Sequence, residues 1–366
     1  EVALISAASV DEQGNLYCEG AAALSEIAEA ARAAKKNNGL VIAAVGGIRR
    51  EDTEKIFLPE SLIDHIVVHP GIEQVAGIPV RKYWDIFTPK SAALPASKFK
   101  RAYVALKFAN AAAAITPARG ETDQVLARTA ATLLAGCIRS GDLVNIGVGL
   151  PEEVAGIFCE AGLAGEVLFS VESGALGGIP APGLFFGSAI HPQALESSRA
   201  TFERYRRALP AAVLGFLQID GAGNVNVSRR GPHTSNVVGP GGFIDICEAA
   251  RTIIFVGNWT VRGKTIVEDG SLKIISHGVP KLVPVLHEVT FSAARALAAG
   301  KQVYYVTDIG VMKLSAEGLV LTAVFPGIDI EDIERTLQIP ISVSRDVALV
   351  DTHVLTGKDF HLRIGS

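Results

Sequence analysis

Along this chain, short runs of apolar residues alternate with longer stretches in which apolar residues recur at helical spacing. Residues 143–146 and 303–307 are short apolar runs typical of buried strands, and 123–139 has apolar side chains on one helical face. Turn residues at 268–270 and 316–318 predict hairpins. This alternation of strands and helices predicts an α/β fold with parallel or mixed open sheets. Further helices are expected at 290–299 and at 330–337, entered from Asp329.

Two parts of the chain resemble each other. Residues 2–18 match 213–228, and residues 26–34 match 245–253 with the same Glu-Ala-Ala-Arg tetrapeptide, which is expected to be helical in both places. Two matches in the same order indicate an internal repeat, and therefore two similar open α/β domains. In the first match an aspartate opens a turn, a glycine takes positive φ and an asparagine helps to close it. The aligned residues are Asp11, Gly14 and Asn15 in one copy and Asp220, Gly223 and Asn224 in the other.

The second copy is preceded by a helix, a strand and a glycine turn that the first copy does not show. By symmetry we expect the first domain to be incomplete at its N-terminus, with roughly ninety further residues in a partner chain or in a removed part of the polypeptide. Apolar strands at 2–5 and 40–45 would otherwise be exposed. The expected division is a first domain at 1–90, a linker rich in Pro and Ala at 91–120 and a second domain at 121–366.

The segment 167–180 places Glu172 directly after an apolar run that predicts a buried parallel strand. Residues at the C-terminal ends of such strands face the ligand crevice. Gly174 and the glycines after it remove side chains, so the backbone could pass close to a bulky substrate. Glu172 could act there as a nucleophile, a base or a ligand. The alternative is a structural glutamate that begins a turn and pairs with a surface arginine. Residues 174–207 show no clear periodicity.

Two other glycine-rich turns stand where helices are expected to begin. Gly147 and Gly149 follow a strand, and free backbone N–H groups at such a position suit a phosphate-bearing ligand. Residues 239–242 precede a helix expected at 244–251, and their N–H groups could stabilise an oxyanion. Each segment could also be only a tight turn.

The composition is that of a globular protein, with 366 residues, 49% hydrophobic and 20% charged. A net charge of -4 argues against nucleic acid as a general partner. The four cysteines have no paired spacing, which favours a reducing, cytoplasmic location, and the histidines fall singly, so no metal site is expected. The most apolar stretch, 102–115, is interrupted by Lys107 and Asn110, and neither a membrane segment nor a signal peptide is expected.

Four motifs follow one another along the chain: NIGVGLP at 145–151, SVESGALGGIP at 170–180, DGAGNVNVS at 220–228 and GPGGFIDI at 239–246, the last running on into ICEAARTIIFVG. Together they resemble the motifs of the family I coenzyme A (CoA) transferases. The likeness is greatest to the propionate and acetate CoA-transferase branch, and it covers nearly the whole chain. In that family two similar α/β halves pair, either fused or as separate subunits, which agrees with the internal repeat.

The resemblance implies an enzyme that moves CoA from an acyl-CoA to a small carboxylic acid. Glu172 would attack the thioester, forming an acyl-glutamyl anhydride and then a glutamyl-CoA thioester, with ping-pong kinetics. CoA would be a substrate, and no permanently bound cofactor or metal is implied. The setting would be short-chain fatty acid or ketone body metabolism, and the assembly a homo- or hetero-oligomer. The implied oxyanion donor is Gly242, and the implied CoA-binding residues are Gly147, Gly149, Gly174 and Gly241.

Two departures from the family pattern bear on this expectation. A glutamine in the front of the family's α half, which supplies another oxyanion contact, is not in this sequence. Where the family has a glycine-rich step, this chain has Arg204, Arg206 and Arg207. The first interpretation of these arginines is a solvated helix face, and the second is that they bind CoA phosphates. The alternative functions are an acyl-CoA hydrolase or ring-opening hydrolase with Glu172 as base, and a non-catalytic metabolite-binding subunit.

Overall fold

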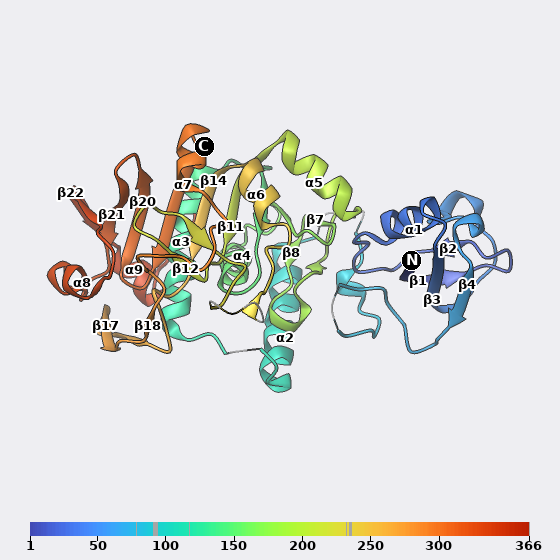
Figure 1. Cartoon of the computed structure of the whole chain (residues 1–366). Helices are drawn as coiled ribbons and strands as arrows, with labels where there is room; N and C mark the ends of the chain where they lie inside the picture. The colour runs from blue at the N-terminus through green and yellow to red at the C-terminus, as the bar shows by residue number, and fades with distance from the viewer. Residues whose placement is uncertain (78, 91–93, 117, 232, 234–235, 366) are drawn as a thin grey trace. The chain divides into compact units, whose positions relative to one another are not determined.

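The computed structural model describes residues 1–77, 79–90, 94–116, 118–231, 233 and 236–365, and the chain forms two compact units (Figure 1). Unit 1 comprises Glu1–Thr116 and Leu168–Arg204, and unit 2 comprises Pro117–Val167 and Tyr205–Ser366. Both units combine helices with parallel strands, so the predicted α/β class is confirmed. Residues 168–204 group with the N-terminal residues, and the assignment of 1–90, 91–120 and 121–366 to family halves stays a prediction.

Unit 1 contains a four-stranded sheet with α1 (Ile27–Lys36) packed against one face. In this sheet β1 (Val2–Val10), β3 (Leu40–Ile48) and β4 (His65–Val68) run parallel, and β2 (Leu16–Tyr17) pairs antiparallel with the end of β1. Alternate residues of β1 and β3 are buried under α1, as the two-residue period of a strand requires. The core there consists of Ile5, Ala7, Val10, Leu16, Ala28, Ala31, Ala34, Val41, Ala43, Val45 and Leu58.

The rest of unit 1 includes one helix, and the first seven residues of a second, that the sequence pattern did not predict. The range 91–120, expected to be a linker, carries the 18-residue helix α2 (Ala96–Ala113), and the range 174–207 ends in α5 (Ser198–Arg207). Apolar side chains lie on both the buried and the exposed sides of α2, whereas α5 buries polar side chains, so neither shows a single apolar stripe. The short elements are β6 (Leu168–Ser170), β7 (Ala175–Leu176), β8 (Ile179–Pro180), β9 (Ala189–Ile190), β10 (Ala194–Leu195) and 3-10 helices at Thr53–Lys55, Glu60–Leu62, Asp85–Phe87 and Gly183–Phe185.

Unit 2 contains the parallel strands β5 (Leu143–Ile146), β11 (Leu209–Leu214), β14 (Ala250–Val256) and β19 (Gln302–Thr307). The helix α3 (Glu121–Cys137) packs on β11, β14 and β19. The three elements predicted at 143–146, 123–139 and 303–307 are confirmed, with small differences at their ends. The sheet continues through β20 (Gly310–Ser315), β21 (Gly318–Val324) and β22 (Ser342–Leu349).

The remaining elements of unit 2 are short. The hairpins predicted at 268–270 and 316–318 are confirmed, and Asp329 accepts a hydrogen bond from Glu331 N at the start of the last predicted helix. The helices are α4 (Leu150–Glu160), α6 (Phe243–Ala249), α7 (Ala293–Ala298), α8 (Ile330–Thr336) and α9 (Thr352–Thr356). The paired short strands are β12 (Gln218–Ile219) with β13 (Val225–Asn226), β15 (Thr260–Val261) with β18 (Val279–Pro280), and β16 (Lys264–Glu268) with β17 (Ser271–Ser276).

The two aspartate turns of the internal repeat have the same hydrogen bonds. In each turn the aspartate carboxylate accepts from the backbone N–H groups two and four residues later and from the asparagine amide. Gly14 and Gly223 both have positive φ, 98° and 87°. The predicted turn chemistry is therefore confirmed in both copies. The distances are 3.0, 2.8 and 2.9 Å from Asp11 to Gln13 and Asn15, and 3.0, 2.9 and 2.9 Å from Asp220 to Ala222 and Asn224.

The two copies of the second matched segment, 26–34 and 245–253, differ in structure. The tetrapeptide Glu29–Arg32 lies within α1, whereas Glu248 belongs to the last turn of α6 and Arg251 already belongs to β14. The helix predicted over 244–251 was therefore wrong at its end. Ala250 pairs with Leu209 of β11, and this strand pairing takes the place of another helical turn.

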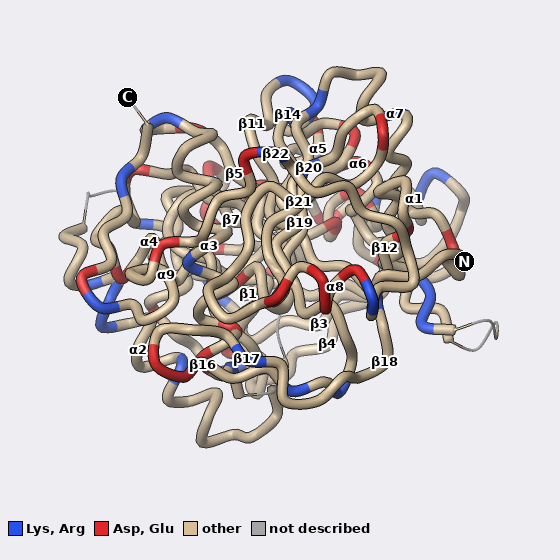
Figure 2. Tube along the Cα trace, turned by 90° about the vertical axis from the view of Figure 1, so that its left-hand side faces the viewer, with Lys and Arg blue, Asp and Glu red and all other residues tan. Residues whose placement is uncertain are grey.

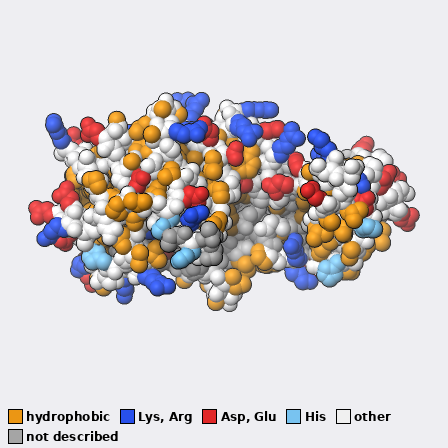
Figure 3. Space-filling model, viewed as in Figure 1, with side chains coloured by type: hydrophobic (Ala, Val, Ile, Leu, Met, Phe, Trp, Pro, Cys, Tyr) orange, Lys and Arg blue, Asp and Glu red, His pale blue; other side chains and the backbone are white. Residues whose placement is uncertain are grey.

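The two sheets also differ in how their faces are covered. On the face of the unit 1 sheet away from α1, the side chains of Val2, Leu4, Leu40 and Val67 are exposed, Leu4 by 77%. Figure 3 shows hydrophobic side chains gathered over β1, β3 and β4. In β11, by contrast, residues 211–214 are all buried.

Charged residues of both signs are distributed along the chain (Figure 2). Several pair on the surface, such as Lys35 with Asp64 at 2.7 Å. Within the described ranges, no helix has both the length and the apolar character needed to span a membrane.

Candidate active site

Glu172 lies in a tight turn of residues 171–175, directly after β6 in unit 1. Gly174 N donates to Val171 O (3.1 Å) and Val171 N donates to Ala175 O (3.3 Å), which closes the turn. Val171 is buried and Glu172 is half-buried, so the carboxylate-bearing residue stands at the end of the strand and partly in solvent. The strand itself ends at Ser170 and is shorter than the apolar run suggested.

Gly174 is needed for the packing of this turn. Its φ is 106°, and a Cβ atom built there would overlap the backbone oxygen of Glu196. Glu196 N in turn donates to Gly174 O (2.9 Å). The expected close approach of backbone is therefore made by the chain's own residues after β10. Contact between Gly174 and CoA stays a prediction.

Ser173 ties the turn to two other segments of unit 1. Its backbone oxygen accepts from Ser25 N (3.0 Å), and its hydroxyl donates to the backbone oxygen of Gly187. Ser25 has a left-handed φ of 49°, and its own backbone oxygen accepts from Ser198 N (3.0 Å). Non-glycine residues keep such a conformation where the surrounding contacts fix it. The residue next to Glu172 is thus held from outside the turn.

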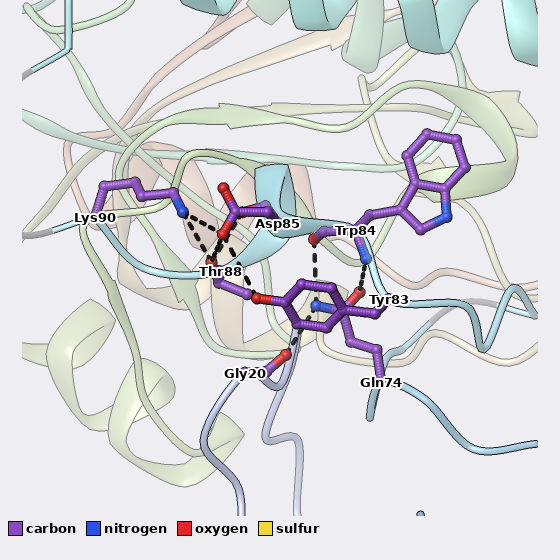
Figure 4. Close-up of polar contacts among 7 residues, drawn as sticks. All are labelled: Gly20, Gln74, Tyr83, Trp84, Asp85, Thr88 and Lys90. Atoms are coloured by element: carbon purple, nitrogen blue, oxygen red, sulfur yellow. Dashed lines mark hydrogen bonds and ion pairs between the residues drawn. The ribbon is translucent and has the colours of Figure 1, made fainter. Parts of the chain in front are cut away.

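A polar network centred on Gln74 fixes the loop that leads to Ser25 (Figure 4). Gln74 Nε2 donates to the backbone oxygens of Gly20 (2.8 Å) and Trp84 (3.3 Å), and its Oε1 accepts from Trp84 N (3.1 Å). Only 2% of Gln74 is exposed. Sequence reasoning did not single out Gln74 or Ser25, because a lone amide or hydroxyl in a loop carries no recognisable pattern.

Asp85, the residue after Trp84, has contacts of its own and accepts a hydrogen bond from Lys90 Nζ (2.7 Å). This hydrogen bond holds the pKa of Asp85 below its usual value. His191, whose backbone N–H donates to Ile86 O (2.6 Å), packs edge-on against Phe99. Burial, followed by the nearby Lys90 charge, lowers the pKa of His191 below 6.5, so its imidazole is neutral at pH 7. These contacts join residues 85–90 to the segment after β9.

In unit 2, Gly147 and Gly149 lie between β5 and α4, as predicted, but their N–H groups are used. Gly147 N donates to Val213 O (2.9 Å), and Gly149 N donates to Glu152 Oε1 (2.6 Å). A Cβ at Gly147 would come within 3.2 Å of Leu214 Cδ2. Both N–H groups therefore already have an acceptor within the chain, and Gly147 is buried whereas Gly149 is half-buried.

Gly241 and Gly242 precede α6 in a more open setting. Gly241 has φ 53° and is exposed, and a Cβ there would meet open space. Gly242 is half-buried, and its backbone oxygen accepts from Ile246 N (3.0 Å). There is room beside this turn for another group.

The predicted site residues fall in both units. Glu172 and Gly174 share one turn in unit 1, whereas the other predicted glycines belong to unit 2. Arg204 pairs with Glu196 (2.7 Å) and Arg206 with Asp245 (3.4 Å). These ion pairs favour the solvated helix face over binding of CoA phosphates.

Metal and disulfide chemistry have few candidate residues. In the part of the chain that the structure describes, no three His, Cys, Asp or Glu side chains are grouped to hold a metal ion. The four cysteines, Cys18, Cys137, Cys159 and Cys247, are free thiols.

Sequence comparison relates the chain to characterised enzymes, although no protein-family model matches it. It is 32% identical over 369 residues to the caffeate CoA-transferase of Acetobacterium woodii, which covers 98% of this chain and 66% of that protein. It is 28% identical over 363 residues to the acetate CoA-transferase YdiF of Escherichia coli strain K12, which covers 96% of this chain and 62% of that protein. The chain therefore spans slightly less than two thirds of the length of these relatives.

Structural comparison agrees with the sequence relationship. The chain matches the crystal structure of the acyl-CoA transferase YdiF from Escherichia coli O157:H7 in a thioester complex with CoA, with a TM-score of 0.80 and 27% identity. The match covers 100% of this chain and 65% of that one.

Proposed function

We propose that this chain, a homologue of the family I CoA-transferases, carries the nucleophile that moves CoA from an acyl-CoA to a small carboxylic acid. The observation that carries this proposal is the place of Glu172, on a fixed turn at the end of β6, in a chain 32% identical to a CoA-transferase. Because the chain spans less than two thirds of its relatives, the proposal concerns its part in the reaction.

The chemistry of a carboxylate accounts for each step. The Glu172 carboxylate attacks the thioester carbonyl and the C–S bond breaks. CoA departs as the thiolate, and an acyl-glutamyl anhydride remains on the protein. The thiolate attacks the glutamyl carbonyl and expels the acyl group as its carboxylate, which leaves a glutamyl-CoA thioester. The acceptor carboxylate reverses these steps. The relative YdiF has been crystallised in a thioester complex with CoA, which supports a thioester of the same kind here.

The glycine turns have supporting roles in this proposal. Gly242 would donate its backbone N–H to the oxyanion of each tetrahedral intermediate, with Gly241 leaving room for CoA beside it. Gly147 and Gly149 would let CoA lie against backbone, since neither carries a side chain. Gly174 would act mainly by allowing the turn that carries Glu172.

The relatives are named for caffeate and for acetate, and both of these are carboxylates. We propose a carboxylate acceptor, with short-chain fatty acid or ketone body metabolism as the setting. We place the reaction in the cytoplasm, where free thiols like the four cysteines of this chain are kept reduced.

We also propose that further polypeptide, either joined to this chain or in a separate subunit, completes the unit 1 sheet. The apolar face away from α1 is exposed, and among the described residues β1 pairs on its β2 side only at Ser9 and Val10. In the other copy of the repeat, the matching strand β11 is paired with β5 and packed by α3. A helix and a parallel strand of that kind would cover the exposed face. Sedimentation and a denaturing gel of the active enzyme test this: a homogeneous species of this chain alone with full turnover would contradict it.

Trapping the intermediate tests the catalytic proposal. The active assembly is incubated with an acyl-CoA and no acceptor, and peptide mapping by mass spectrometry is expected to find CoA on Glu172. Glu172→Gln keeps the size of the side chain but removes the nucleophile, so transfer should fall by at least about 1,000-fold with little change in Tm.

Other outcomes distinguish the alternatives. Steady hydrolysis with no CoA on any residue would favour the hydrolase, with Glu172 as base. Binding of acyl-CoA without turnover by the complete assembly would favour the metabolite-binding subunit. An unfolded Glu172→Gln variant would mean that this glutamate is structural.

A further inference from the structure

We infer that Gln74 is a positioning residue for Glu172 and acts through the bridging loop, residues 18–26, between β2 and α1. The inference rests on the proposed function of Glu172 for its effect on catalysis. Its structural part, that Gln74 fixes the turn at 171–175, stands on the hydrogen bonds of unit 1 alone.

The first end of the bridging loop is held by Gln74 and its neighbour. Gln74 Nε2 donates to Gly20 O (2.8 Å), and Ala22 N donates to Val75 O (2.6 Å). The same amide also binds both the N–H and the backbone oxygen of Trp84, so its orientation is fixed by more than one partner. Because only 2% of Gln74 is exposed, loss of its amide would remove these hydrogen bonds at a position that is closed to solvent.

The middle of the bridging loop is held in place because it is buried. Ala21, Ala22 and Ala23 are all at most 2% exposed, so the loop cannot shift without opening the core of unit 1. A displacement of Gly20 would therefore be passed on to Ser25 rather than absorbed by a flexible surface segment.

The second end of the bridging loop contacts the turn at 171–175. Ser25 N donates to Ser173 O (3.0 Å), and Ser25 keeps its left-handed φ of 49° between this bond and the bond from Ser198 N. Ser173 is bonded covalently to Glu172. A shift of about 1 Å in a reacting group can cost roughly 100-fold in rate. Gln74 thus sets where the Glu172 carboxylate lies although it does not touch the substrate.

A matched pair of variants tests the inference in the full chain within its active assembly. Gln74→Leu removes the amide with little change in size. Asn15→Leu is the control, because the Asn15 amide is also buried and also makes hydrogen bonds, to Asp11 and Glu60, in a turn that does not contact Ser173. Hydrogen exchange followed by mass spectrometry is measured on peptides covering 18–26 and 171–175, and kcat and KM are measured for the acyl-CoA.

In Gln74→Leu we expect amide exchange about tenfold faster in both peptides, a kcat lower by roughly 10 to 100-fold and a KM within about twofold of the parent. In Asn15→Leu the faster exchange should be confined to the peptides around residues 11–16 and 60. Equal exchange of the 171–175 peptide in the two variants would overturn the inference, whatever their activity. If the parent protein never carries CoA on Glu172, the proposed function fails while the exchange result still decides the role of Gln74.

A second substitution covers the case in which Gln74→Leu does not fold. In Gln74→Glu a protonated carboxyl can still donate to Gly20 O and accept from Trp84 N, whereas the ionised form can only accept. Protection of the 171–175 peptide, corrected for the intrinsic pH dependence of exchange, should return toward the parent value as the pH falls. Protection that does not change with pH would show that the donor at residue 74 has no part in fixing the turn.

Discussion

The Asp11 turn joins β1 to β2 and the Asp220 turn joins β12 to β13, and the two turns have nearly the same structure. The matched strands that precede them, β1 and β11, lie in sheets of different completeness. In both turns the asparagine Oδ1 also accepts a backbone N–H from a later segment, Glu60 in one copy (3.0 Å) and Ala293 in the other (2.9 Å). The strand β11 is paired along both edges, whereas β1 is fully paired only with β3. The repeat therefore preserves local turn chemistry, while the number of neighbouring strands depends on the segments around it.

The largest effect should come from placing a charge on the two matched strands. Leu4 and Val213 each stand seven residues before the turn aspartate. Val213 is 0% exposed, so Val213→Lys should cost more than about 4 kcal/mol and prevent unit 2 from folding. Leu4 is exposed, so Leu4→Lys should change the stability of this chain by less than about 0.5 kcal/mol. Urea unfolding followed by Trp84 in unit 1 and Trp259 in unit 2 measures both.

Unit 1 unfolding in Leu4→Lys to the same degree as unit 2 in Val213→Lys would contradict the comparison. It would mean that the exposed face of β1 is covered within this chain. If further polypeptide covers the face, the same Leu4→Lys substitution should become strongly destabilising in the complete assembly.

A smaller difference is expected between the turn aspartates themselves. Asp11 is buried and accepts an additional hydrogen bond from Tyr17 OH (2.7 Å), whereas Asn226 stands at the position that corresponds to Tyr17. We expect Asp11→Ala to cost about 3 kcal/mol and Asp220→Ala about 2 kcal/mol. Equal costs, measured by urea unfolding at pH 7, would show that the tyrosine adds nothing.

The dependence on pH provides an independent check of the Asp11 turn. Burial is the largest single influence and would raise the pKa of Asp11, but hydrogen bonds from Asn15, Tyr17 and Gln13 together lower it below 3.8. A carboxyl group with a lowered folded pKa stabilises the fold above its unfolded pKa of about 3.9, and this contribution is lost as the pH falls through the folded pKa. The stability of unit 1, measured by Trp84 fluorescence between pH 6 and pH 3, should therefore decline less steeply in Asp11→Asn than in the parent.

The sequence predicted those features that local chemistry determines. The aspartate turns, the strand 143–146 and the hairpins at 268–270 and 316–318 follow from turn residues and apolar runs. Glu172 could be singled out because it follows an apolar run and precedes glycines. Gln74 and Ser25 could not, because their importance comes from contacts with Gly20 and Ser173, which are distant in the sequence.

The helix α2 and the end of α6 are two further features that the local sequence could not predict. A helix with apolar residues on two faces has no stripe to recognise, and a strand that begins at Ala250 does so because β11 lies beside it. Tertiary pairing decides between the two conformations when the local sequence permits both.

The smallest expected effect is a change in stability that has opposite signs in the two copies of Glu-Ala-Ala-Arg when the arginine is replaced by valine. Arg32 is exposed in α1 and Arg251 is exposed in β14. Valine is a poorer helix former than arginine but a better strand former, so Arg32→Val should destabilise unit 1 by about 0.5 kcal/mol, and Arg251→Val should stabilise unit 2 by up to about 0.5 kcal/mol. Urea midpoints of variants that keep only Trp84 or only Trp259 would measure the two shifts. Shifts of the same sign would mean that the identical tetrapeptides share one conformation in solution, which the pairing of Ala250 with Leu209 does not allow.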